Sequence, residues 1–596
     1  MRRPIAVVAG LAAGALALVA AGCGGGGGSK SGAQGSTSSG VEGTSHTLVT
    51  SGAKRGGTIT VLSVGDIDHL DPGAAYYQFT YAITYVTQRP LLAYKPNSIQ
   101  PVPDLAASMP TVSKDGKTVT VHIKQGIKYS PPVNRTVTSA DVKYAIERGF
   151  DAAVGNGYAS AYFGVIQGAP TKIGNTVPNI SGIQTPNKYT IVFKLSKPSG
   201  IFVSALQEPL TAPVPPEYAR KFDKGTSSSY GNHQVATGPY MVQNNASGTI
   251  TGYSPGKSII LVRNPNFNPK TSWRPAYADK IVFKEGFDPS VATRQILSGQ
   301  GDVNGDFPPP AADLKSITSN SSQKSELEFT PTAGNRFVAL NTQKPPFNNK
   351  YVRMAVAYVL DKNAMRLTRG GPIDGKIATH FIDPSFGSHG FNQAGGFNFD
   401  PFKTPNEAGS VSKAEAMLKK AGFKSGKYSG PVITQVADNA APGSNTAAVV
   451  ANSLEKIGFK VKTISVEHSA MYTRFCGVPK NAPNICPNVG WLADFHEPEA
   501  DLDANFDGKN ILPANNVNWS QLNDPKINAL MAKAKGELNP EKRWAEWGHI
   551  DDLITESAAA IPWIWENSPT LYSTKVTHAS EQWNGGEPDV SFMSVK

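Results

Sequence analysis

The first 54 residues cannot contribute to a folded core, and this constrains the chain more than any other feature. Arg2 and Arg3 precede an apolar, Ala-rich stretch from Ile5 to Ala21, an order that is typical of bacterial export signals. The stretch contains two glycines and has fewer strongly apolar residues than the roughly 20 that a membrane-spanning helix needs. We therefore predict a signal peptide at residues 1–22 and not a permanent transmembrane helix.

The cysteine that follows this stretch predicts a lipid anchor. The sequence Ala20-Ala21-Gly22-Cys23 resembles the lipobox of bacterial lipoproteins, although Leu is usual where this chain has Ala20. The alternative is a plain secreted precursor with an incidental cysteine. Residues 23–54 are rich in Gly, Ser and Thr, a composition that forms flexible tethers because it buries little apolar surface. Two acyl chains on Cys23 would hold the protein on the extracytoplasmic face of the cell membrane.

Charge and cysteine content narrow the possible partners. Loss of Arg2 and Arg3 lowers the formal net charge from +11 to +9, and the remaining Lys and Arg residues are scattered, so no nucleic-acid partner is expected. Cys476 and Cys486 are the two cysteines left beside Cys23, and in an exported chain they predict a disulfide. The alternative, a metal pair, lacks a nearby Cys or His cluster at ligand spacing. We predict neither a metal nor a cofactor.

Short β-rich runs alternate with helical stretches from Arg55 onward, which predicts a mixed α/β fold. The expected strands are 57–64, 117–123 and 190–195, with another following a helix end within 453–461; the expected helices are 138–148, 352–359 and 412–421. Thr138 or Ser139 can cap the first helix, and Ser412 is a possible N-cap of the last. About 540 folded residues exceed a single core, so at least two lobes are expected.

Six groups of short phrases occur in a characteristic order along the chain. They are Arg55–Val61 with Leu70–Pro72; Pro103–Ala106 with Asp115–Thr118; Gly126–Tyr129 with Val137–Val142; Thr237–Tyr240 with Arg263–Phe267; Leu340–Thr342 with Pro345–Phe347 and Val352–Arg353; and Gly490–Phe495. Together they resemble the extracellular solute-binding proteins of the peptide/nickel importer family, family 5. The phrase Asp494–Pro498 is more similar to the oligopeptide-binding branch than to the nickel branch.

The resemblance implies a two-lobed periplasmic-binding-protein-like fold with an extra domain inserted in the first lobe. The first lobe would comprise residues 55–94, 213–332 and 553–596, the inserted domain 95–212, and the second lobe 333–552. The chain would cross between the lobes near Phe337–Asn341 and near Ile561–Trp565.

The resemblance also implies a ligand site at the end of the Gly490–Phe495 phrase. Asp494 would bind the ammonium group of a peptide, with a turn or cap residue as the alternative interpretation. Gly490 and Leu492 would pair the ligand backbone as an added strand. Trp491 could stack on a ligand side chain, or it could belong to the core.

Four further residues are weaker candidates for this site. By analogy with the family, Tyr76 and Tyr77 would line the cleft from the first lobe, although surface packing would explain them equally well. His496 would hydrogen-bond nearby backbone, and Arg336 would brace the connection between the lobes.

The resemblance implies a protein that captures a peptide and delivers it to the permease subunits of an ABC importer. It also implies that the protein acts as a monomer. Oligosaccharides and nickel chelates are alternative solutes, and a signalling receptor or a secreted hydrolase on this fold are alternative functions. The enzyme motifs fit poorly. Gly252–Ser258 is one residue too short for a phosphate-binding loop, and Gly299–Gly305 lacks the dinucleotide spacing. We therefore predict that the protein is not an enzyme.

Overall fold

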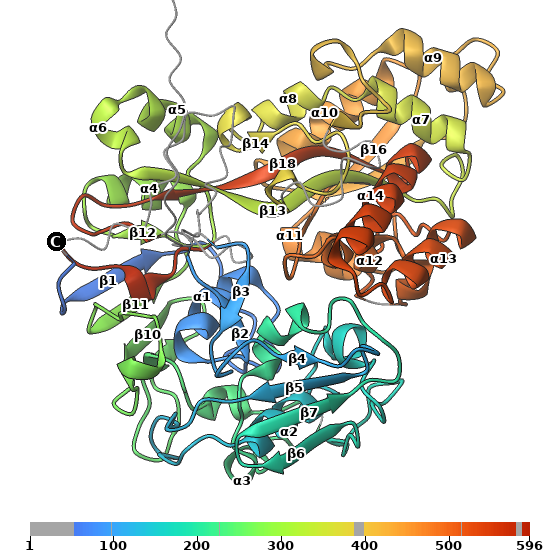
Figure 1. The fold of residues 1–596 in the computed structure, drawn as a ribbon. Helices are drawn as coiled ribbons and strands as arrows, with labels where there is room; N and C mark the ends of the chain where they lie inside the picture. The colour runs from blue at the N-terminus through green and yellow to red at the C-terminus, as the bar shows by residue number, and fades with distance from the viewer. Residues whose placement is uncertain (1–52, 97, 226, 387–397, 514, 580–586) are drawn as a thin grey trace, which may run out of the picture. The chain divides into compact units, whose positions relative to one another are not determined.

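The computed structural model describes residues 53–596 except 97, 226, 387–397, 514 and 580–586. The predicted signal peptide, the lipidation site Cys23 and nearly all of the tether lie outside these residues. Three sheets of four or six strands, a two-stranded sheet and the helices around them form the described part of the chain (Figure 1). Within it, no helix is both long and apolar enough to cross a membrane.

The first sheet combines the start of the folded chain with segments more than 180 residues further on. Its strand order is β12-β1-β11-β10-β8, with β9 paired to β10. The strands are β1 (Thr58–Leu62), β8 (Tyr240–Val242), β9 (Tyr253–Ser254), β10 (Ser258–Arg263), β11 (Lys280–Lys284) and β12 (Val303–Asn304). Strand β1 lies between β12 and β11 and pairs parallel with both. Helices α1 (Gln78–Thr87) and α4 (Pro289–Leu297) contribute to the clusters of buried side chains around this sheet.

A second, four-stranded sheet lies within the segment predicted as an insertion. Its order is β4-β5-β7-β6, with β4 (Thr111–Val112), β5 (Thr118–His122), β6 (Ile183–Asn187) and β7 (Thr190–Lys194). Alternating burial along β5 and β7 confirms the two strands expected here. Helix α2 (Ser139–Arg148) packs on this sheet and begins at Thr138, whose side chain forms a capping box with Asp141. The short strands β2 (Leu92–Tyr94) and β3 (Pro101–Pro103) pair separately.

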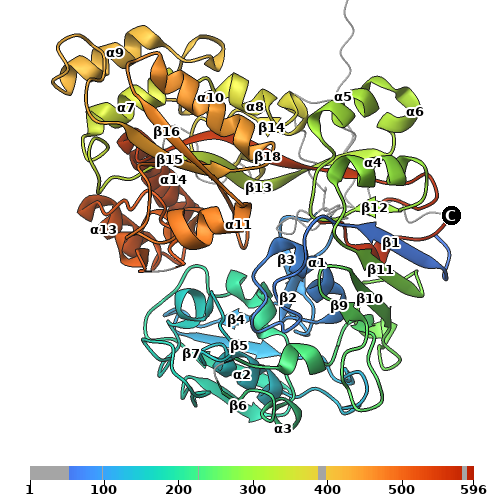
Figure 2. The same cartoon turned by 180° about the vertical axis from the view of Figure 1, so that it is seen from behind.

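The third sheet belongs to the second half of the chain and has the order β14-β18-β13-β17-β15-β16. Its strands are β13 (Leu327–Leu340), β14 (Gly375–Lys376), β15 (Ile433–Asp438), β16 (Val461–Val466), β17 (Ile485–Leu492) and β18 (Ala560–Leu571). Helices α7 (Lys350–Val359), α8 (Lys362–Leu367), α9 (Val411–Lys420) and α10 (Gly443–Glu455) surround one core, and α12 (Pro498–Phe506), α13 (Pro525–Ala534) and α14 (Pro540–Ser557) belong to the other. Figure 2 shows the helices of the first group from behind.

One detail of the predicted helices differs from the structure. Helix α9 begins at Val411, and its N-cap is Ser410, whose side chain accepts a hydrogen bond from the backbone N–H of Lys413 at 3.4 Å. Ser412 lies inside the first turn. Two serines two positions apart offer the same capping chemistry, so the sequence alone did not distinguish them.

The long strands β13 and β18 connect the first and third sheets. They run antiparallel from the pair Leu327–Leu571 to the pair Ala339–Ala560. Leu327 and Leu571 pack in a cluster with Leu62 of β1, whereas the opposite ends of both strands lie in the cores of the third sheet. The crossing near Phe337–Asn341 stays a prediction. Phe337, Ala339 and Leu340 pair with β17, and the register of β13 with β18 shifts twice, between Pro331 and Gly334 and again between Arg336 and Phe337.

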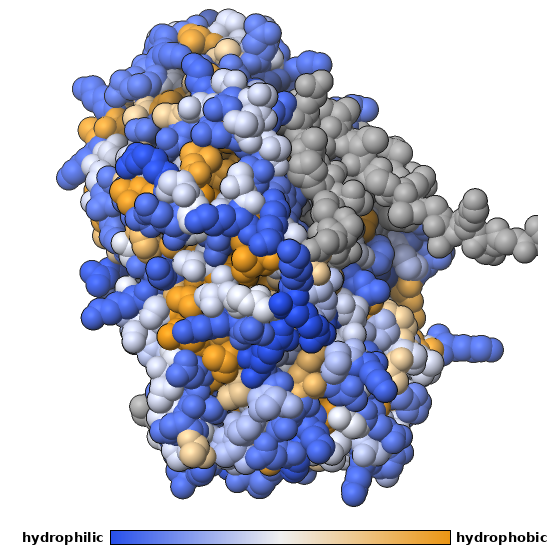
Figure 3. All heavy atoms as spheres, turned by 90° about the vertical axis from the view of Figure 1, so that its left-hand side faces the viewer, coloured by the Kyte–Doolittle hydropathy of each residue, from blue (hydrophilic) through white to orange (hydrophobic). Residues whose placement is uncertain are grey.

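Successive side chains of β13 enter different cores, as expected for a strand that is covered on both faces. Phe337 and Ala339 belong to a cluster that also contains residues of the inserted segment, and Val338 and Leu340 belong to a separate cluster under α7 and α10. On the outside, Figure 3 shows extended hydrophilic areas with hydrophobic residues in smaller groups on one face of the molecule. This distribution is normal for a protein surface.

Candidate functional site

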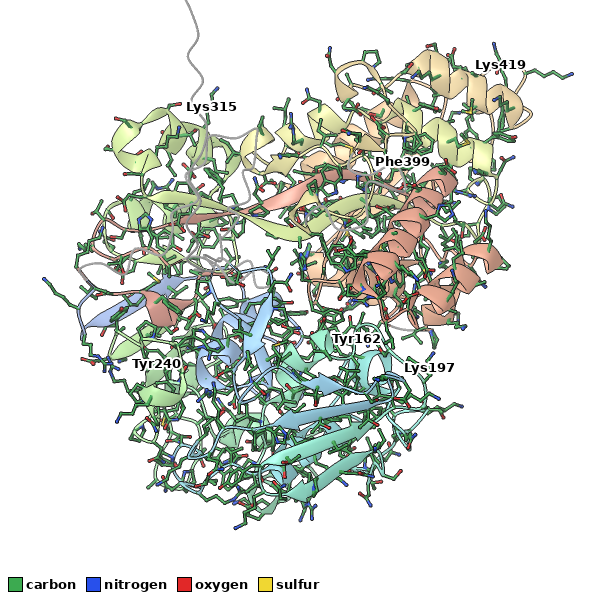
Figure 4. The ribbon with its side chains drawn as sticks, viewed as in Figure 1. Tyr162, Lys197, Tyr240, Lys315, Phe399 and Lys419 are labelled. Carbon is green, nitrogen blue, oxygen red and sulfur yellow. A yellow bond between two sulfur atoms is a disulfide. The ribbon has the colours of Figure 1, made fainter. Side chains whose placement is uncertain are left out.

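Asp494 follows β17 after one residue, and its carboxylate contacts a segment more than 300 positions earlier in the chain. The side chain is buried and accepts a hydrogen bond from the hydroxyl of Tyr162, a residue that Figure 4 labels. Its backbone oxygen accepts a hydrogen bond from Nε2 of Gln207 at 2.9 Å. Helix α12 begins four residues later with Glu497 at its N-cap, so Asp494 does not cap that helix.

Burial governs the protonation of Asp494. Loss of solvation raises the pKa of its carboxyl group to about 7, against the hydrogen bonds from Tyr162 and Tyr158, which lower it. A carboxylate in this environment ionises more readily when a positive charge arrives beside it. The group is thus suited to bind a cation near neutral pH.

A second buried carboxylate, Glu208, lies close to Asp494. Gln207 joins the two groups, because its Nε2 also donates to Oε1 of Glu208 at 2.6 Å. The other oxygen of Glu208 has no hydrogen-bond partner among the described residues. Burial, followed by the charge of Asp494, raises the pKa of Glu208 well above its ordinary value. Two adjacent carboxyl groups with raised pKa values favour either a shared proton or an added cation.

A row of stacked tyrosines leads from Asp494 towards the surface. Tyr162 stacks on Tyr158 with ring centroids 5.5 Å apart, and Tyr158 stacks on Tyr76 at 5.2 Å. The exposed fraction is 37% for Tyr76 and 48% for Tyr77. Oδ2 of Asp68 accepts hydrogen bonds from the backbone N–H groups of both exposed residues. The structure therefore connects Tyr76 to Asp494 through two further rings and leaves Tyr77 beside the row.

Four residues around Asp494 were not predicted from the sequence: Tyr158, Tyr162, Gln207 and Glu208. Tyr158 directly precedes the π-helical segment Ala159–Phe163, and Tyr162 lies within it. Residues four positions apart lie on one face of a helix. That spacing was the available signal. No local pattern indicated Gln207 and Glu208, because they reach Asp494 only through the tertiary fold.

Strand β17 presents the backbone of Gly490 and Leu492 along an edge. These residues pair with Arg336 and Gly334 of β13 on one side. On the other side, β15 pairs with β17 only at Ile485, and no other described strand continues along it. The N–H of Gly490 points to this side and donates to the hydroxyl of Tyr472 at 3.3 Å.

Trp491 faces the opposite side of the sheet from its neighbours Gly490 and Leu492 in β17. Its side chain is buried, and the residue is 9% exposed. Its indole N–H donates to the carbonyl oxygen of Ala500 at 2.8 Å, and its ring packs edge-on against Trp519 with centroids 6.2 Å apart. These contacts favour the core interpretation of Trp491 over direct stacking on a ligand.

Arg336 and His496 form contacts that join segments next to the site. Nε of Arg336 lies 2.5 Å from a carboxylate oxygen of Glu566, so an ion pair links β13 to β18. A Cβ atom at Gly490 would lie 3.2 Å from side-chain atoms of Arg336, which would have to shift by a few tenths of an ångström to admit it. The backbone N–H of His496 donates to the hydroxyl of Tyr94 at 3.0 Å.

A disulfide between Cys476 and Cys486 joins β17 to the helical turn that carries Tyr472. Among the residues that the structure describes, no three His, Cys, Asp or Glu side chains gather as a possible metal site.

Fold and site together describe a two-lobed solute-binding protein of the periplasmic-binding-protein type. Residues 100–512 match the model of the bacterial extracellular solute-binding proteins, family 5 (middle). Since this match covers more than half of the chain, the protein belongs to that family, and both the predicted family and the predicted fold class are confirmed. Proteins of this family serve ABC importers as extracytoplasmic solute-binding components.

Individual relatives differ in what their names say they bind. The periplasmic oligopeptide-binding protein OppA of Escherichia coli K12 is 23% identical over 78% of each chain. The heme-binding protein A of Haemophilus influenzae is 24% identical over 80% of each chain. Among solved structures, the clavulanic acid biosynthesis oligopeptide binding protein 2 has a TM-score of 0.80 and 26% identity, with 91% of this chain and 96% of that chain covered.

Proposed function

We propose that this protein is the lipid-anchored peptide receptor of an ABC importer. It captures peptides between its two lobes and delivers them to the permease subunits of the transporter. It acts as a monomer and catalyses no reaction. The relatives named for oligopeptide binding support this choice of solute.

The observation that carries the proposal is the buried carboxylate pair at the end of β17. Asp494 comes from the second half of the chain and Glu208 from the predicted insertion, and Gln207 holds both. The α-ammonium group of a peptide has three N–H donors and one positive charge. It would therefore offset the charge of Asp494 and give the free oxygen of Glu208 a donor.

The edge of β17 suits the remainder of an extended peptide. Backbone groups of Gly490 and Leu492 would pair with the ligand main chain, a mode in which affinity depends little on the ligand side chains. Tyr76 and Tyr77 would cover the ligand from the first lobe. Closure follows because a ligand that contacts both lobes binds the closed form more tightly than the open form.

Thermal unfolding of the mature protein with peptides of two to eight residues tests the proposal. A free-amine peptide at 100 times its dissociation constant should stabilise the fold by about 2.7 kcal/mol. The N-acetylated peptide should give a much smaller shift, as should the variants Asp494→Asn and Glu208→Gln with the free-amine peptide. Asp279→Asn, in a solvent-exposed ion pair with Arg263, is the matched control and should behave as the wild type.

Two results would contradict the peptide assignment. Equal stabilisation by acetylated and free-amine peptides would exclude Asp494 as the ammonium site. Stabilisation by oligosaccharides, heme or nickel chelates alone would leave the importer role intact but replace the solute.

The lipid anchor is tested separately. Mass spectrometry of the membrane-bound protein should find a diacylated cysteine at residue 23 as the new N-terminus. The variant Cys23→Ser should leave the membrane fraction, and retention of that variant would contradict the anchor.

A further inference from the structure

A cavity of about 900 Å³ opens between the predicted insertion and residues 270–273, lined by none of the residues assigned above to the peptide site. One wall comes from the end of β5 and the start of β7, where His122 and Thr190 pair. The opposite wall is the segment from Lys270 to Trp273. Lys124 lies between the two walls and lines the cavity as well. The volume is in the range of small-molecule sites in proteins.

Behind this cavity lies a buried ion cluster with more positive than negative charge. Asp104 is the single carboxylate of the cluster. One of its oxygens accepts a hydrogen bond from Nε of Arg89 and the other accepts one from Nη1 of Arg274, both at 2.7 Å. Side chains of all three residues are at most 1% exposed. Two guanidinium groups on one carboxylate leave a net charge of +1, and such an excess is costly to bury.

Lys124 adds a further positive charge. Its Nζ donates to the backbone oxygens of Asp104 at 2.8 Å and Thr271 at 3.1 Å, and neither acceptor is charged. Burial, followed by the charges of Arg89 and Arg274, lowers the pKa of Lys124 to about 8. Asp104 is the one carboxylate among the groups that act most strongly on this lysine.

Several donors beside the cavity have no acceptor among the described residues. Nε and Nη2 of Arg274 and the indole N–H of Trp273 are buried without a hydrogen-bond partner. The guanidinium of Arg274 stacks over the ring of Trp273 at 4.8 Å, and Lys95 approaches the same ring at 5.8 Å. Unpaired buried donors together with excess positive charge are what an anion would satisfy.

We propose that this cavity binds the phosphoryl group of an organic phosphate. Lys124 and Lys270 contact the anion, Trp273 supplies an aromatic wall and an N–H donor, and the Arg89–Asp104–Arg274 cluster provides the positive field. A free phosphate ester and the headgroup of an anionic phospholipid carry the same chemistry. Neither source depends on the proposed capture of peptides.

The test measures binding to the full mature chain, made with Cys23→Ser so that it carries no lipid. The probes are inorganic phosphate, glycerol 3-phosphate, and phosphatidylcholine vesicles with and without phosphatidylglycerol. Isothermal titration gives the affinity for the soluble probes, and co-sedimentation gives it for the vesicles. Glycerol 3-phosphate or the phosphatidylglycerol vesicles should bind, and the first result would indicate a free ester whereas the second would indicate a headgroup.

Substitutions assign the binding to the cavity. Lys124→Gln should raise the dissociation constant about tenfold, as expected for loss of a charged hydrogen bond. Lys270→Gln should also weaken binding, and its exposed side chain makes it safe for folding. Lys128→Gln removes an equal charge from an exposed position outside the cavity lining and should change nothing. Absence of binding to every probe, or equal effects of all three substitutions, would overturn the proposal.

Discussion

At the scale of single residues, the proposed function depends on the buried carboxyl group of Asp494 and on the side chains that contact it. Asp494 was predicted from a phrase at the end of a strand, and the structure places it against Tyr162 and beside Gln207. Both contacts stabilise a carboxyl group that is buried. Its protonation should therefore be visible in both stability and binding.

The first prediction concerns stability. The pKa of Asp494 is about 7 in the folded protein, above its ordinary value of 3.8. The folded state thus holds the proton more tightly, and the contribution of Asp494 to the free energy of unfolding is present below pH 3.8 and lost as the pH rises towards 7. Asp494→Asn should be more stable than the wild type at pH 8, by roughly 2–4 kcal/mol, and close to it at pH 4. Urea unfolding at both pH values measures this, and a constant difference would refute it.

The second prediction concerns protons released on binding. A peptide ammonium favours ionised Asp494, so at pH 6 binding should release protons, with a contribution from Glu208 because the two groups interact. Calorimetry in buffers of different ionisation enthalpy counts these protons. Asp494→Asn should release fewer protons on binding. An unchanged number of released protons in that variant would show that they come from other groups.

At the scale of elements, the end of the chain is attached to β13 by a histidine between two carboxylates. Nδ1 of His578 lies 3.1 Å from Glu328 of β13, and Nε2 lies 3.1 Å from Glu326. The same imidazole stacks on Tyr572 at the end of β18. The charged form of His578 therefore links three segments.

This contact gives the third prediction. Hydrogen bonds and charge from Glu328 and Glu326 raise the pKa of His578 against the opposing effect of burial. Its stabilisation is present in full below the ordinary value of 6.5 and is lost as the pH rises through the higher folded value. His578→Gln should lower the free energy of unfolding by roughly 1 kcal/mol at pH 5.5, and by less at pH 9. Denaturant titrations at the two pH values decide this, and an equal loss at both would show that packing alone matters.

At the scale of the whole molecule, β13 and β18 extend from one hydrophobic cluster into others. The hydrogen bond from Tyr162 to Asp494 joins the predicted insertion to the second half of the chain. One hydrophobic cluster includes residues of the predicted insertion and residues of and after β17, among them Tyr162 and Phe495. In the proposed function, opening of the protein for a ligand would separate this contact. The equilibrium between open and closed forms should then respond to a single hydroxyl group.

Removal of that hydroxyl is the fourth prediction. Tyr162→Phe keeps the ring stacked on Tyr158 but deletes the hydrogen bond to Asp494, at a cost to the closed form of about 1–3 kcal/mol. Small-angle X-ray scattering of the ligand-free variant should give a larger radius of gyration than the wild type. Tyr144→Phe, which loses a hydroxyl bond to Asp223 within the first half of the chain, is the control and should match the wild type in size.

The sequence by itself determined the family, the α/β class and several individual elements. Alternating residues marked β5 and β7, and the Thr138–Asp141 pair marked the start of α2, because these signals are local. Only the tertiary structure decided which Ser caps α9, where β13 leaves the first core, and that Trp491 packs inside. It also brought Tyr158, Tyr162, Gln207 and Glu208 to Asp494. Burial, and with it the pKa of a carboxyl group, depends on neighbours hundreds of residues away, which no local pattern records.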